Sequence, residues 1–132
     1  MRTRIIWLLL LGLGGGALAG PVIVKDGKPA AVIVTAAKPS ESAARAAAEL
    51  QKFVALMSGA TLSIQTDATV QPAAQPLLLV GKSLLVKGVE IPSGNDRNFS
   101  REGFVIKTAG NQVILAGNEV GDYRGTEYAV YR

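Results

Sequence analysis

The chain has 132 residues, with 14 Lys and Arg against 10 Asp and Glu, and it contains neither His nor Cys. This length predicts a single domain. The missing residue types exclude a Ser–His triad, a Cys nucleophile, a thiolate zinc site and a disulfide framework.

Residues 1–19 have the pattern of a secretory signal peptide. Arg2 and Arg4 precede an apolar run over residues 5–13, and small residues at Ala17 and Ala19 predict cleavage after Ala19. A membrane anchor would need about 20 apolar residues, and this run is shorter. We therefore expect export to the periplasm or the cell exterior.

Cleavage would leave residues 20–132 as one nearly neutral domain. Removal of these 19 residues, two of them Arg, leaves 113 residues with a net charge of +2. No stripe of basic residues interrupts that balance, so we expect no nucleic-acid partner and no membrane contact after cleavage.

Two strands are expected at the start of this domain, over Val22–Lys25 and Ala30–Val34. Asp26-Gly27 between them is a strong signal for a tight hairpin, because both central residues of such a turn need positive φ. Pro29 lacks an N–H and is expected at the start or unpaired edge of the second strand.

A helix is predicted from Glu41 to Met57, capped by Ser40 and stopped by Gly59. Its apolar face follows helical spacing, and Arg45, Glu49 and Lys52 lie off that face on a solvated side. The expected face comprises Ala43, Ala47, Leu50, Val54 and Met57.

The rest of the domain alternates strands and loops. Leu77–Val80 is a continuous apolar run, typical of a buried central strand. The other predicted strands are Thr61–Ile64, Gly103–Thr108 and Gln112–Ala116, the last two joined by a hairpin turn at 109–111. Residues 66–75 and 88–100 are predicted loops, and Lys82–Lys87 a short helical turn.

A second helix is expected near the end of the sequence, with Asp122 as its cap. It would contain Tyr128 and Tyr131, which we interpret as packing residues. No stop signal follows Arg132, so the helix is expected to be truncated there. Together these elements predict an α+β fold: a mixed β-sheet of about five to six strands with helices packed on one face.

Candidate sites are few. Exported proteins without His include glycosidases, which hold two carboxyl groups in an open cleft. Glu119, Asp122 and Glu127 are the candidates, but a loop, a cap and a solvated helix position explain them better. We therefore assign no catalytic, cofactor-binding or metal-binding residue.

Three short motifs resemble known sites. The glycine run at 12–16 lies inside the signal and follows no strand, so it is not a dinucleotide site. Gly81-Lys82-Ser83 lacks the earlier glycine of a phosphate-binding loop, because Pro76 stands in its place. Asn98-Phe99-Ser100 fits the N-glycosylation pattern, which has meaning only in a host that has that machinery.

Several strings, in order, resemble a known module. It is the non-catalytic N-terminal α/β domain that precedes the barrel in bacterial β-N-acetylhexosaminidases, α-glucuronidases and related secreted proteins. The matching strings are residues 23–29, 47–53, 57–60 with 62–64, 78–81, 102–106, 113–117 and 124–131. The resemblance covers nearly all of residues 22–132.

The resemblance implies a mixed sheet with helices on one side, followed by a (β/α)8 barrel that carries the catalytic carboxylates. The expected function is therefore that of an accessory domain of an exported glycoside hydrolase. Its partner would be the catalytic barrel of the same polypeptide, and carbohydrate would be the substrate of the parent enzyme. The alternative is a stand-alone secreted module that binds a glycan or a protein. An enzyme complete in these 132 residues has no support among the residue types present.

Overall fold

The computed structural model describes residues 19–94 and 101–132. The predicted signal peptide, apart from its last residue, and the Asn98 glycosylation motif lie outside the described residues. Both stay predictions.

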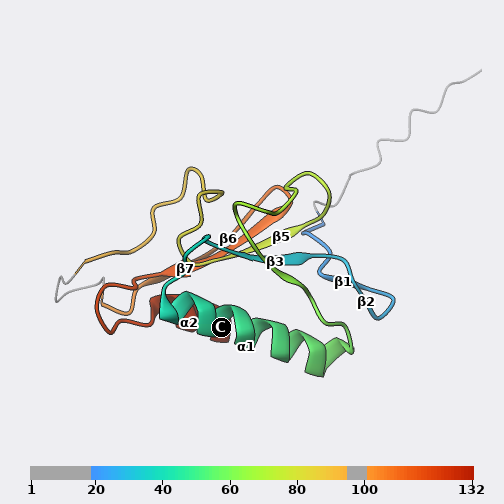
Figure 1. Ribbon diagram of the computed structural model, residues 1–132, viewed down its shortest axis with the longest axis horizontal. Coiled ribbons are helices and arrows are strands. Elements are labelled where there is room, and N and C mark those ends of the chain that lie inside the picture. The colour runs from blue at the N-terminus through green and yellow to red at the C-terminus, as the bar shows by residue number, and fades with distance from the viewer. Residues whose placement is uncertain (1–18, 95–100) are drawn as a thin grey trace, which may run out of the picture.

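Five strands form one mixed sheet in the order β4-β3-β5-β7-β6. Neighbouring strands are parallel, except for the antiparallel hairpin of β6 and β7. The strands are β3 (Val32–Thr35), β4 (Ile64–Thr66), β5 (Leu77–Val80), β6 (Phe104–Ala109) and β7 (Gln112–Gly117). Helices α1 (Glu41–Ser58) and α2 (Gly125–Tyr131) lie on one face of the sheet (Figure 1). The predicted α+β fold is confirmed.

A small hairpin precedes the main sheet. Strands β1 (Val24–Lys25) and β2 (Lys28–Pro29) pair across Asp26 and Gly27, whose φ angles of 51° and 71° are those expected for this turn. The prediction that the first strand pairs with a strand over Ala30–Val34 was wrong. Strand β3 instead enters the main sheet between β4 and β5, with all four residues buried. Its unbroken apolar run suits a strand that is covered on both faces.

Helix α1 begins and ends where the sequence predicts. The Ser40 hydroxyl accepts a hydrogen bond from the Ala43 N–H at 3.0 Å, and Gly59 ends the helix with φ of 75°. The prediction that Met57 belongs to the buried apolar face was wrong, because Met57 is 79% exposed. An 18-residue helix is about 27 Å long, whereas strands of three or four residues span about 13 Å. The last turn of α1 therefore passes beyond the sheet.

The central strands β3, β5 and β7 are covered on both faces of the sheet. On the helix side, Ile33, Leu78 and Val80 pack with residues of both helices, among them Ala47 and Ala129. On the other side, a second cluster packs against residues of the segment 81–94. That cluster includes Val34, Leu77, Leu79, Ile114 and Ala116, and its covering residues are Leu85, Val86, Val89 and Ile91. Segment 81–94 runs opposite the helices in Figure 1.

Two local elements differ in extent from the prediction. The strand expected at 61–64 begins only at Ile64, because Leu62 is fully buried in the helix-side core and its carbonyl accepts from the Gln51 side chain at 2.8 Å. The region Lys82–Lys87, predicted as a short helical turn, contains a single turn closed by the Val86 N–H on the Ser83 carbonyl at 3.1 Å. Among the described residues, no helix combines the length and apolarity needed to cross a bilayer.

Candidate functional site

The loops that could form a site gather where the parallel strands end. The chain leaves β3 through α1 to reach β4 on one side, and β5 then joins β3 on the other side. The carboxyl ends of β3 and β5 therefore mark the point where the strand order reverses, which is where open α/β sheets usually bind ligands. Helix α1 begins at this end of the sheet, and so does α2.

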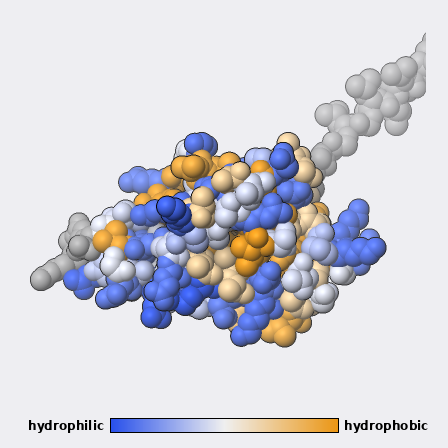
Figure 2. Space-filling view, in the orientation of Figure 1, coloured by the Kyte–Doolittle hydropathy of each residue, from blue (hydrophilic) through white to orange (hydrophobic). Residues whose placement is uncertain are grey.

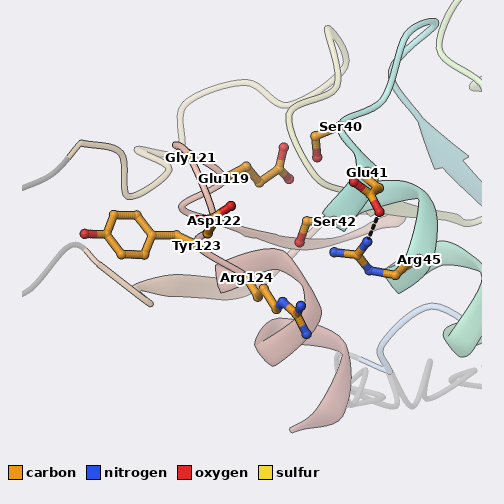
Figure 3. Close-up of a pocket in the computed structure, with 9 residues that line it drawn as sticks. All are labelled: Ser40, Glu41, Ser42, Arg45, Glu119, Gly121, Asp122, Tyr123 and Arg124. Carbon is orange, nitrogen blue, oxygen red and sulfur yellow. Dashed lines mark hydrogen bonds and ion pairs between the residues drawn. The ribbon is translucent and has the colours of Figure 1, made fainter.

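A hollow of about 260 Å³ opens between the first turn of α1 and the loop that joins β7 to α2. We call it the polar hollow. Charged or hydroxyl-bearing side chains supply eight of its nine lining residues (Figure 3). The lining residues are Ser40, Glu41, Ser42, Arg45, Glu119, Gly121, Asp122, Tyr123 and Arg124.

The α1 wall contributes two hydroxyls with different surroundings. Ser40 is the N-cap, and its oxygen is occupied by the Ala43 N–H. Ser42 is 7% exposed, and its Oγ has no hydrogen-bond partner among the described residues. In Figure 3 the Ser42 side chain lies between Glu119 and Arg124.

An ion-pair group joins the two helices beside the hollow. Arg45 donates from Nη2 and Nε to the same Glu127 oxygen, at 3.0 and 3.3 Å, and also binds Glu41. Glu127 is only 5% exposed, so the expectation of a solvated helix residue was wrong. Arg45 is exposed, as expected for the solvated side of α1, but its guanidinium also reaches the buried Glu127 carboxylate. These hydrogen bonds, chiefly those with Glu127, raise the pKa of the Arg45 guanidinium above its ordinary value.

The β7–α2 loop is held by a second buried group. Thr126 is fully buried, donates to Glu119, and accepts the Gly117 N–H at 3.0 Å. Gly81, directly after β5, packs so closely that an added Cβ would stand 2.9 Å from a Glu119 oxygen. Glu119 is therefore fixed between the end of β5 and the start of α2.

Asp122 does not cap α2. Helix α2 begins after Arg124, which has no side-chain cap bond, and Asp122 lies in the wall of the hollow. The first residue of α2, Gly125, instead packs on the backbone of Gly117 and Gly103, where an added Cβ would stand 2.3 Å from the Gly103 carbonyl. The Gly125 N–H at the start of α2 donates to the Asn118 backbone carbonyl at 2.9 Å.

The three carboxylates singled out in the sequence therefore separate. Glu119 and Asp122 line the hollow, whereas Glu127 is bound to Arg45. Sequence reasoning missed Ser42, Arg45 and Arg124 as members of this site. Only Arg45 carried a signal, since Glu41 stands four residues before it on the same helix.

The donor set of the hollow is suited to hydrogen bonding. Within residues 19–94 and 101–132, no three His, Cys, Asp or Glu residues are grouped so that they could hold a metal ion. Carboxylates, two guanidinium groups and hydroxyls instead offer donors and acceptors side by side.

Fold and site together define a small α+β domain with a mixed-charge hollow at the carboxyl ends of its parallel strands. Comparison with protein-family models and with curated proteins finds no match to this chain.

Proposed function

We propose that this chain is the non-catalytic N-terminal accessory domain of an exported carbohydrate-active hydrolase, and that its helix layer packs against the catalytic barrel. The proposal combines the ordered sequence strings described above with one feature of the structure. That feature is the apolar outer surface of the two helices.

Five large apolar side chains of the helix layer are exposed: Phe53, Leu56, Met57, Tyr128 and Tyr131. Leu56, which is 71% exposed, stands eleven residues after Arg45 and so lies three turns along the same line of α1. At Arg45 this side of α1 faces α2, whereas at Leu56 it is not covered by α2. Figure 2 shows apolar surface at the C-terminal end of α1.

The two tyrosines of α2 are part of the same exposed apolar surface. Tyr128 and Tyr131, interpreted as packing residues, are 44% and 56% exposed, so they leave an apolar surface for a partner. Exposed apolar residues that recur on neighbouring elements are typical of interaction surfaces, whereas single ones are normal on any protein. We therefore assign the helix layer as the face that meets the barrel.

Two observations test the proposal. A reading frame that continues after the codon for Arg132 into repeated strand–helix units would support it, and a stop codon there would contradict it. The purified chain should also show no turnover of aryl glycosides. Turnover above that of a vector control would overturn the non-catalytic role.

The alternative, a stand-alone binding module, is favoured by a different observation, the polar hollow. Its charge and hydroxyl content point to a small polar ligand. Ligand binding in the hollow is compatible with barrel docking, because the hollow lies at the start of α1 and the exposed apolar residues of α1 lie at its end.

A further inference from the structure

The Ser42 hydroxyl is the strongest sign of a ligand in this molecule. Buried polar groups in proteins nearly always have a hydrogen-bond partner, and a donor left without one costs stability. Ser42 is 7% exposed, and its Oγ has no partner among the described residues. Ser42 is the second residue of α1. A serine inside a helix often donates its hydroxyl to the carbonyl four residues earlier, but here that residue precedes the helix.

Two charged groups of the hollow also make no internal bond through their side chains. The Asp122 carboxylate and the Arg124 guanidinium have no hydrogen bond or ion pair within the described residues, although the Arg124 backbone N–H is bound by Glu102 at 2.8 Å. Glu119 uses one oxygen for Thr126. The hollow therefore presents a guanidinium and two carboxylates to one small space, and the unpartnered Ser42 hydroxyl is buried in its wall.

The charges of the side chains around the polar hollow indicate which class of ligand it can bind. Glu41, Glu119 and Asp122 face Arg45 and Arg124 in the wall, and buried Glu127 adds a further negative charge behind Arg45. A phosphate or sulfate group would meet more negative than positive charge, despite the positive end of α1. A neutral molecule with adjacent hydroxyls meets no such repulsion, since each hydroxyl both donates to a carboxylate and accepts from a guanidinium.

We propose that the polar hollow binds one ring of a neutral sugar, with Ser42, Asp122 and Arg124 as its main polar contacts and Glu119 as a further acceptor. The wall is mostly polar, and the Tyr123 ring points away from the other labelled side chains in Figure 3. The sugar ring is therefore held by hydrogen bonds, with little aromatic stacking. Binding in the millimolar range is expected, as for a small polar ligand in an open site.

The inference does not rest on the accessory-domain proposal. Barrel docking concerns the exposed apolar residues of the helix layer, whereas sugar binding concerns the start of α1. An absence of sugar binding would leave the docking proposal intact, and a stop codon after Arg132 would leave the hollow intact.

Amide chemical-shift titration of the purified full chain tests the inference directly. D-glucose, N-acetyl-D-glucosamine, sodium sulfate and glycine are each added up to about 20 mM, a range that detects millimolar dissociation constants. Saturable shifts at Ser42, Asp122 and Arg124 with either sugar are expected. An absence of sugar shifts there would overturn the inference. Stronger shifts there with sulfate or with glycine would also overturn it, because the site would then select an anion or a zwitterion.

Variants connect any binding to the named groups. Asp122→Asn removes one charge and should weaken sugar binding about tenfold, because a hydrogen bond to a charged group is lost. Glu90→Gln, an exposed carboxylate on the other face of the sheet, is the matched control and should not change it. Equal weakening in both variants would contradict a localised site.

Ser42→Ala separates binding from folding. If the hydroxyl serves a ligand, the variant should fold at least as stably as the parent chain and bind sugar several-fold more weakly. A variant that loses stability while keeping its sugar affinity would show a structural role for the hydroxyl, and would overturn its assignment as a contact.

Discussion

Arg45 of α1 and Glu127 of α2 are 82 residues apart in sequence, yet two guanidinium nitrogens of Arg45 donate to a single Glu127 oxygen, at 3.0 and 3.3 Å. The carboxylate is buried and the Arg45 side chain is 42% exposed. The pair fixes how far the short α2 is shifted along the long α1.

Loss of this contact should loosen α2. Glu127→Gln keeps the shape of the side chain and removes its charge, so we expect the free energy of unfolding to fall by about 1 to 2 kcal/mol in urea denaturation. Lys52→Gln breaks the exposed pair with Glu49, whose charged atoms are 3.9 Å apart, and should change it by less than about 0.5 kcal/mol. Similar losses in both variants would contradict a specific role for Glu127.

The pH dependence of this contact follows from the Arg45 pKa. The folded-state pKa is raised, so the stabilisation by the charged guanidinium is complete below its ordinary pKa and is lost only as the pH rises through the raised value. The stability difference between the parent chain and Arg45→Gln should therefore be unchanged from about pH 7 to pH 9. A fall across that range would contradict the assignment.

Gly81 should be the least replaceable of the turn glycines. It has φ of 79°, and an added Cβ would stand 2.8 Å from the Ala43 Cβ. Gly110 has φ of 57° and open space around it. Gly110→Ala should therefore cost only the backbone strain, about 1 kcal/mol, and Gly81→Ala at least about 2 kcal/mol more. Equal costs in thermal unfolding would show that the close approach is not limiting.

Thr126 connects the end of β7 to Glu119. Thr126→Val keeps its shape but leaves the Gly117 N–H and Glu119 without their partner, so we expect a loss of about 2 to 3 kcal/mol. Thr126→Ser keeps the hydroxyl and removes one methyl, at about 1 kcal/mol. Urea denaturation of both variants gives the order, and a Ser variant less stable than the Val variant would contradict it.

The exposed apolar residues of α1 should contribute little to stability. Leu56→Ala is expected to change the free energy of unfolding by less than about 0.5 kcal/mol, because this side chain is 71% exposed. Leu79→Ala, in the fully buried centre of β5, should cost about 3 kcal/mol. A large loss at Leu56 would mean that it packs within the domain and is not free for a partner.

Sequence patterns predicted the elements whose signals are local. The capping serine and terminal glycine placed α1, the Asp-Gly pair placed the first turn, and the unbroken run at 77–80 placed a buried strand. Each signal acts within a few residues, so no knowledge of distant contacts is needed.

The errors concern contacts between distant segments. Glu127 is buried because it pairs with Arg45, and Met57 is exposed because the strands do not reach beneath the last turn of α1. The start of α2 depends on close backbone contact between Gly117 and Gly125. A single glycine in the sequence does not show which distant segment it will contact. The polar hollow could not be predicted for the same reason, since its walls come from segments about 80 residues apart.

The two outer strands of the sheet differ in a way that bears on self-association. On one side, β4 offers only three residues, too few to template a long intermolecular strand pair. On the other side, β6 offers six, most of them exposed, including Phe104 and Ile106. Lys107 lies in the middle of that strand, and a charge in this position opposes the addition of a like strand from a second molecule. Aggregation by strand addition is therefore directed to β6, and Lys107 is the residue that restrains it.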